Sequence, residues 1–136
     1  MRIVIEVDGA SRGNPGASAC GIVLRIEGGQ EREVGLYLGN TTNNVAEYLA
    51  VIAGLQLARE EGAREIRLQT DSELLVKQLS GAYRVRAEHL RPLYQKAMRL
   101  LGQFDKTHVT HVPRQNNRRA DRLANLALDT ASQIPC

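Results

Sequence analysis

Cysteine and aromatic residues are scarce in this sequence of 136 residues. Its two cysteines, Cys20 and Cys136, are too few for the disulfide framework of a small secreted protein, and neither stands at metal-ligand spacing. Tryptophan is absent and aromatic residues make up only 4% of the chain, which argues against a single-strand binder built from stacked aromatic side chains. We therefore expect an intracellular protein, with the cytoplasm as its location.

Long apolar runs are missing as well. No run approaches the roughly 18–20 apolar residues that cross a membrane, and the chain enters a strand-like pattern at once, without a signal segment. A chain of this length can close a hydrophobic core without cross-links. We expect a single domain over residues 1–136 with no membrane association.

Lysine is rare among the basic residues, since only Lys77, Lys96 and Lys106 of the 18 basic side chains are lysines. The excess of arginine has two explanations that charge alone does not separate. One is a compositional bias of the host, and the other is contact with phosphate, to which the guanidinium offers a planar fork of donors.

Hydrophobic periodicity predicts nine elements in the order β-β-β-α-β-α-α-β-α. We expect strands at Arg2–Val7, Ala19–Ile26, Glu33–Leu38, Glu65–Thr70 and Thr107–Val112, and helices at Asn44–Glu61, Ser72–Leu79, Ala87–Leu101 and Asn116–Ala131. A meander followed by strand–helix–strand units predicts an α/β protein with a five-stranded mixed sheet, two of its strands parallel to the first, and helices on both faces. Ligands of such sheets bind at the carboxyl ends of the strands.

Two acids follow strand-like runs and are candidates for that edge. Asp8 comes directly after Ile3–Val7 and opens a glycine-rich stretch, for which an ordinary turn, a phosphate cradle and a metal ligand are competing interpretations. The glycines match neither a Walker motif nor a dinucleotide fingerprint, which weakens the cradle. Asp71 lies between a strand and a helix, where a turn or cap role is the ordinary alternative and Ser72 is the better N-cap.

Two further acids lie near helix starts. Glu47 heads a stripe of small apolar residues, so it faces the core, although with Asn44 as N-cap it would also fit the third position of a capping box. Asp121 lies in the first turns of the last helix, where complementing the helix dipole is its ordinary role. The predicted topology could bring all four acids to one edge of the sheet.

Four carboxylates cannot crowd together in the ionised state without a counter-charge. Mg²⁺ supplies one, because it binds through a few carboxylates, waters and substrate phosphate oxygens. Two such ions about 3.5–4 Å apart can activate a water and stabilise the leaving oxygen of a phosphodiester. The four acids therefore favour a metal-dependent enzyme acting on phosphate esters.

Four stretches, in order over nearly the whole chain, resemble the type 1 ribonuclease H family: DGASRGNPG, TTNNVAEY, TDSELLVKQL and VPRQNNRRADRLANLAL. Each stretch carries one of the four acids. The resemblance implies the α/β ribonuclease H-like fold and endonucleolytic hydrolysis of the RNA strand of RNA–DNA hybrids, leaving 5′-phosphate and 3′-hydroxyl ends. It also implies two divalent ions per site, Mg²⁺ with Mn²⁺ as a substitute, and a monomer that needs no protein partner.

Carried over residue by residue, the resemblance makes Asp8, Glu47, Asp71 and Asp121 the catalytic metal ligands. Glu47 would also accept a hydrogen bond from a ribose 2′-hydroxyl, the group that distinguishes RNA from DNA. The residues expected to contact the hybrid are Gly9 to Ser11 through their backbone, Asn14, Asn43 and Asn44 from the minor-groove side, and Thr42 at a phosphate of the DNA strand.

The chain departs from the family pattern around the last acid. Many bacterial members carry a histidine in a glycine-rich loop there, whereas this loop is short and holds none. Arg114 is the residue that we expect to assist at the scissile phosphate or in product release, while His108 and His111 lie upstream in a strand pattern. Glu73 stands where the family has a glutamine, which weakens one expected contact with the hybrid.

The basic helical protrusion of many members also has no counterpart, since only Gly81–Ala87, with Arg84 and Arg86, separates the two middle helices. No N-terminal hybrid-binding domain is present in the sequence either. We therefore expect a lower and more salt-sensitive affinity than in members with those additions.

Two alternatives remain open. One is a nucleic-acid-binding module that has lost catalysis, and the other is a nuclease of the same fold acting on double-stranded RNA or on DNA junctions. The complete set of acids favours an enzyme over a binding module, because carboxylates without metal would repel phosphate.

Overall fold

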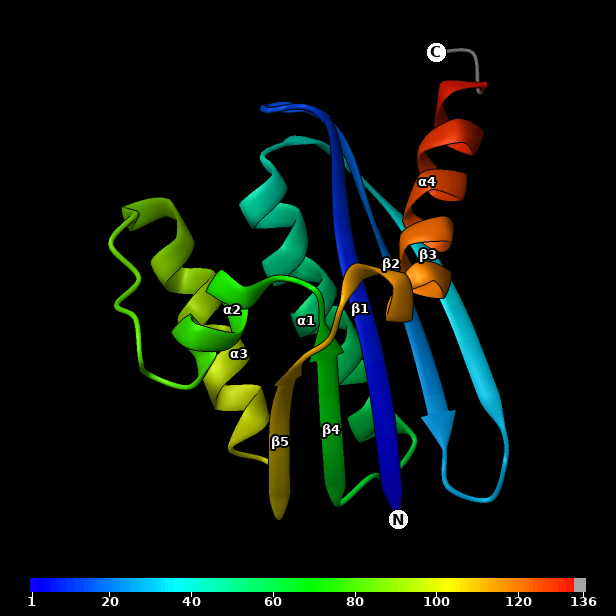
Figure 1. Ribbon diagram of the computed structural model, residues 1–136, viewed down its shortest axis with the longest axis vertical. Coiled ribbons are helices and arrows are strands. Elements are labelled where there is room, and N and C mark those ends of the chain that lie inside the picture. Colours follow the sequence, from blue (N-terminus) through cyan, green and yellow to red (C-terminus); the bar gives the residue numbers. More distant parts are fainter. Residues whose placement is uncertain (134–136) are drawn as a thin grey trace.

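The first three strands form an antiparallel meander, and two parallel strands extend the sheet beyond β1 (Figure 1). The computed structural model describes residues 1–133. Its strands are β1 (Arg2–Gly13), β2 (Gly16–Ile26), β3 (Glu31–Thr41), β4 (Glu65–Thr70) and β5 (Lys106–His111), in the spatial order β3-β2-β1-β4-β5. The predicted five-stranded mixed sheet is confirmed.

Helices cover both faces of this sheet, as predicted (Figure 1). They are α1 (Asn43–Glu60), α2 (Glu73–Leu79), α3 (Arg91–Leu101) and α4 (Arg118–Ser132), with short 3₁₀ turns η1 (Glu88–Leu90) and η2 (Arg114–Asn116). The face that carries α1 holds the main core, where Ile5, Val7 and Ile22 contact Gly54 of that helix. Helix α4 packs on the opposite face, against β1, β2 and β3.

The first strand is longer than predicted. We expected it to end at Val7 and to give way to a glycine-rich loop, but β1 continues through Asp8 to Gly13. The reason is its pairing with β2, which runs without a break to the Gly13–Gly16 pair and leaves only Asn14 and Pro15 as the turn. The ordinary-turn interpretation of this stretch is therefore wrong for all but its last residues.

Helix α1 begins one residue earlier than predicted. Its N-cap is Thr42 and not the predicted Asn44. Thr42 Oγ1 accepts a hydrogen bond from the Val45 nitrogen at 3.3 Å. Glu47 is consequently the fifth helical residue, and the capping-box interpretation of it is wrong. The predicted N-cap of α2 is confirmed, since Ser72 Oγ accepts from the Leu75 nitrogen at 3.2 Å.

Other boundaries shifted for local reasons. The predicted helix from Ala87 starts as the η1 turn, and regular α-helix begins only at Arg91, with Pro92 in the first turn, where its missing N–H costs nothing. The last helix starts at Arg118, because Asn116 belongs to the η2 turn.

Few polar groups enter the core. Glu6 is 2% exposed and pairs with Arg25 across β1 and β2 at 2.6 Å, and burial raises the pKa of its carboxyl. Cys20 is buried and free, whereas Cys136 lies outside the described residues. No helix within residues 1–133 is both long and apolar enough to cross a membrane.

Gly21 provides a direct test of how α4 sits on the sheet. A methyl group there would overlap the Ala120 carbonyl oxygen and lie 2.9 Å from the Ala124 nitrogen, both backbone atoms of α4. Because backbone cannot rotate away, we expect Gly21→Ala to lower the free energy of unfolding by at least about 3 kcal/mol, measured by urea denaturation.

Gly102→Ala is the matched control. Gly102 has a φ of −67° at the end of α3, and an added methyl group would meet nothing nearer than the Arg99 carbonyl oxygen at 3.5 Å. We expect its free energy of unfolding to change by less than about 1 kcal/mol. A Gly21→Ala protein as stable as this control would show that α4 does not press on β2.

Candidate active site

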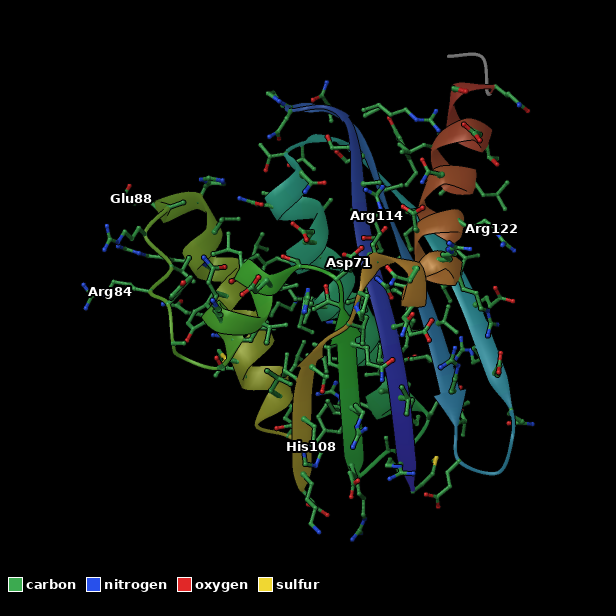
Figure 2. The ribbon with its side chains drawn as sticks, in the orientation of Figure 1. Asp71, Arg84, Glu88, His108, Arg114 and Arg122 are labelled. Carbon is green, nitrogen blue, oxygen red and sulfur yellow. The ribbon has the colours of Figure 1, made fainter. Side chains whose placement is uncertain are left out.

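Four carboxylates from four separate elements line one open cavity of about 570 Å³. Asp8 comes from β1, Glu47 from α1, Asp71 from the end of β4 and Asp121 from α4. Figure 2 shows Asp71 at the end of β4 with Arg114 near it. The structure thus brings together the four acids that the sequence suggested would meet at one edge of the sheet.

The pairing pattern of the strands puts two of these acids at the same level. Parallel pairing between β1 and β4 stops at the Glu6–Gln69 pair, so Asp8 lies just beyond it while still pairing with Gly21 of β2. The β4 strand ends at Thr70, and Asp71 follows directly. The cavity therefore opens where β1 loses its parallel neighbour, at the carboxyl end of β4.

Two contacts with the backbone of β1 bring the acids of α1 and α4 to the cavity. Gly9 of β1 lies against α1 so closely that a methyl group on it would be 2.5 Å from the Glu47 nitrogen. On the other face, the fully buried Asn117 donates its Nδ2 to the Val7 carbonyl oxygen at 2.9 Å. The main-chain carbonyl oxygen of Asn117 accepts from the Asp121 nitrogen at 3.2 Å. The first turn of α4 is thereby tied to β1 beside the cavity.

Burial and the neighbouring carboxylates raise the pKa of two of the acids. Burial raises the pKa of Asp8 to about 8, aided by the charge of Asp71 and by a hydrogen bond and charge from Asp121. Burial also raises the pKa of Glu47 to about 7; a hydrogen bond from Ser72 opposes this rise, and the charge of Asp71 adds a smaller contribution to it. Carboxyl groups in this arrangement hold protons near neutral pH unless a positive charge compensates them.

Several of the expected hybrid-contacting residues lie at this cavity. Gly9, Ser11 and Asn43 line it, and Asn43 Nδ2 donates to Glu47 Oε1 at 3.2 Å. Asn14 lies beside them, since its Oδ1 accepts from the Asn43 nitrogen at 3.0 Å. The turn at the end of β1 and the start of α1 are thus joined next to the acids.

Asn44 and Glu73 do not belong to this lining. Asn44 lines a small neighbouring recess together with Glu47 and Ser72. Glu73 is exposed at the start of α2, where its carboxylate pairs with Lys77 at 3.0 Å, and that hydrogen bond lowers its pKa. The structure therefore separates both residues from the main cavity.

Sequence reasoning missed two lining residues. Ser72, interpreted only as an N-cap, also bonds to Glu47, and Asn125 donates its Nδ2 to Asp121 Oδ1 at 3.3 Å. The spacing of Asn125, one helical turn after Asp121, was a signal that could have revealed it.

Arg114 lines the cavity from the η2 turn and is exposed. The two histidines of β5 do not line it, and Figure 2 shows His108 well down that strand. Within residues 1–133, no group of three or more Asp, Glu, His or Cys side chains is arranged to hold a metal ion by itself. A divalent ion at this cavity would need oxygen ligands besides the carboxylates, as Mg²⁺ ordinarily has.

Comparison with known proteins gives consistent similarities. The chain matches the family model described as reverse transcriptase-like over residues 6–127. It is 49% identical over 131 residues to ribonuclease HI of Halobacterium salinarum, covering 96% of this chain and 66% of that relative. It spans 37% of three mycobacterial relatives that are 44% identical. The chain therefore covers less than two thirds of the length of these curated relatives.

Solved structures agree with this result. The crystal structure of RNase H1 from Halobacterium salinarum has a TM-score of 0.92 and 47% identity, covering 96% of this chain and 99% of that one. LC11-RNase H1, solved in complex with an RNA/DNA hybrid, has a TM-score of 0.89 and 37% identity, with coverage of 96% and 99%. The fold of these proteins is thus shared over almost the whole chain.

The pKa of Asp8 predicts how the stability of the metal-free protein depends on pH. This carboxyl titrates near 8 in the folded state but has an ordinary value of 3.8 when exposed. Between those values the folded state binds more protons than the unfolded state, so stability falls as pH rises. In chelator at pH 8, we expect Asp8→Asn to exceed the parent in free energy of unfolding by at least about 1 kcal/mol, with the difference vanishing near pH 4.

Asp105→Asn is the control, because the Asp105 side chain is 70% exposed and lies 3.9 Å from Arg64. We expect it to stay within about 0.5 kcal/mol of the parent at both pH values. Urea denaturation in chelator measures all three proteins. An Asp8→Asn protein less stable than the parent at pH 8 would contradict the crowding of the carboxylates.

Proposed function

This chain belongs to the type 1 ribonuclease H family, and from that premise we propose that it is a metal-dependent endonuclease that hydrolyses the RNA strand of RNA–DNA hybrids. The products carry 5′-phosphate and 3′-hydroxyl ends. One observation carries the proposal: four carboxylates from distant parts of the chain line a single cavity. The complex of LC11-RNase H1 with an RNA/DNA hybrid supports the choice of substrate.

Asp8, Glu47, Asp71 and Asp121 would hold two Mg²⁺ ions, and Mn²⁺ would serve in their place. The fit is chemical, since these are hard oxygen donors. Their burial, together with their mutual repulsion, raises the pKa values of Asp8 and Glu47 and calls for a compensating cation. Divalent ions bound there supply Lewis-acid stabilisation of the phosphodiester and an activated water. Waters and phosphate oxygens of the substrate complete the coordination that the carboxylates alone do not provide.

Glu47 has a second task in this proposal, which is to accept a hydrogen bond from the 2′-hydroxyl of the RNA strand. The bond that Asn43 Nδ2 donates to Glu47 Oε1 supports it, because that bond orients the carboxylate, whose two oxygens together offer about four acceptor sites. A DNA strand offers no hydroxyl to this acceptor. Selection of RNA then rests on one side chain that also takes part in the reaction.

The remaining contacts with the hybrid follow from the same edge of the sheet. Backbone groups from Gly9 to Ser11 approach the RNA strand, and Asn14, Asn43 and Asn44 read the minor groove. Thr42 Oγ1 already accepts from the Val45 nitrogen, so its hydroxyl hydrogen remains to donate to a phosphate oxygen of the DNA strand. These contacts address backbone and shape, so we expect little sequence preference.

A cleavage assay tests the function. Labelled RNA–DNA hybrid, double-stranded RNA and double-stranded DNA are incubated with Mg²⁺, with Mn²⁺ and with chelator. We expect cleavage of the RNA strand of the hybrid with either metal and none in chelator. Asp8→Asn should lower the rate at least about 100-fold, whereas the exposed Asp105→Asn should match the parent.

Two outcomes would overturn the proposal in different ways. Tight binding of the hybrid without cleavage under either metal would show that the chain is a binding module and not an enzyme. Preferential cleavage of double-stranded RNA would show that the chain is a nuclease with a different substrate.

Arg114 takes the place of the missing loop histidine in this proposal. Its guanidinium lines the carboxylate cavity, where it can bond to the scissile phosphate or to the departing product. We expect Arg114→Ala to lower kcat about 10-fold, equivalent to about 1.4 kcal/mol, with an unchanged melting temperature. Arg64→Ala, with a side chain 81% exposed at the opposite end of the sheet, is the control. Equal kcat values for the two variants would show that Arg114 has no role in the reaction.

A further inference from the structure

A second hollow of about 610 Å³ adjoins the carboxylate cavity along the first two turns of α4. Its lining residues are Arg114, Gln115, Arg118, Asp121, Arg122 and Asn125. Three of them, Arg114, Asp121 and Asn125, line the carboxylate cavity as well, so the two hollows adjoin each other across these side chains. We call the second hollow the arginine groove.

The three arginines of this groove are exposed, and none forms an ion pair or a side-chain hydrogen bond with any other residue in the described range 1–133. Their neighbour Arg119 shows the contrast, because its guanidinium binds Glu31 at 2.7 Å and Glu33 at 3.3 Å. Figure 2 shows Arg114 and Arg122 flanking the start of α4. The groove thus offers unused guanidinium donors.

The position of these charges does not serve the stability of the helix. Arg118 is the first residue of α4 and Arg122 lies one turn later. Cations at a helix N-terminus oppose the macrodipole, and like charges four residues apart repel each other. A bound anion would reverse both effects, because it would compensate the two arginines and the dipole together.

The groove also has a defined position relative to the acids. The hydrogen bond from Asn117 to the Val7 carbonyl ties the start of α4 to β1. Arg118 follows that anchor directly, and Arg122 is adjacent to Asp121 in the chain. A strand that enters the carboxylate cavity can therefore continue into the arginine groove without leaving the surface.

We propose that the arginine groove binds a backbone phosphate of the cleaved strand next to the scissile one, with Arg118 and Arg122 as its donors. This inference rests on the proposed function, which makes a nucleic-acid strand the occupant of the adjoining cavity. Arginine suits the task, since its planar fork bonds to two phosphate oxygens at once. These two residues position the substrate and take no part in the bond cleavage itself.

The test is the salt dependence of hybrid binding by the double variant Arg118→Ala, Arg122→Ala. Binding of a fluorescent RNA–DNA hybrid is measured by anisotropy with Mg²⁺, with Asp8→Asn added to every protein so that cleavage does not interfere. We expect the dissociation constant to rise at least about 10-fold and the slope of log K against log salt to become shallower by about 0.9, as expected for one lost phosphate contact. The variant Arg118→Lys, Arg122→Lys keeps both positive charges, so its slope of log K against log salt should stay close to that of the parent.

The control removes the same charge elsewhere. Arg64 precedes β4 and Arg99 lies near the end of α3, both at the end of the sheet away from the carboxylates. The double variant Arg64→Ala, Arg99→Ala should change the dissociation constant less than about 3-fold and leave the slope unchanged. The melting temperature of Arg118→Ala, Arg122→Ala should equal or exceed that of the parent, because the charges removed oppose the helix dipole.

The outcomes separate this inference from the proposed function. Cleavage of hybrid by the parent chain, with unchanged affinity and slope in Arg118→Ala, Arg122→Ala, would overturn the groove and leave the enzyme intact. Binding that weakens in this variant, without cleavage by the parent, would overturn the enzyme and support the groove. A parent chain that does not bind the hybrid at all would overturn both.

Discussion

Close backbone contact between two helices and the β1–β2 hairpin is the constraint on which the rest of the molecule depends. Because Gly9 has no side chain, the backbone of α1 can approach one face of the sheet closely, and Gly21 allows the same approach of α4 on the other face. A side chain at either glycine would push its helix outward. Because Glu47 belongs to α1 and Asp121 to α4, the cavity of carboxylates exists only when both contacts are made.

These contacts have an electrostatic cost. The fold buries carboxylates close together, and this burial and their repulsion raise the pKa of Asp8. Beside them it gathers arginines at the start of α4, where the helix dipole disfavours cations. Each cluster is unfavourable for the free protein. A phosphate backbone accompanied by divalent ions neutralises both, since the ions compensate the acids and the phosphates compensate the arginines. In our proposals, the bound substrate and its ions offset the charge repulsion within each cluster.

The sequence predicted the order of all nine main elements and the four acids that line the cavity, because both depend on local patterns and short motifs. The sequence-based prediction was wrong where pairing between strands outweighs the local residue composition. The glycines after Asp8 suggested a loop, yet β2 pairs with them as far as Gly13, since glycine tolerates extended backbone when a partner strand is present. The sequence also suggested Asn44 as the cap of α1, because asparagine is a better N-cap than threonine on average, and only the backbone geometry shows that Thr42 takes that position.

What the sequence determined by itself is therefore the inventory: strands and helices in order, acids at their ends, and a resemblance to ribonuclease H carried by four stretches. Tertiary structure alone decided which side chains share a space. It joined the Asn14 side chain to the Asn43 nitrogen, tied Asn117 to the Val7 carbonyl oxygen, and put the arginines of α4 next to acids from three other elements. The physical reason is that these proximities arise from packing between elements far apart in the chain, and local periodicity carries no information about them.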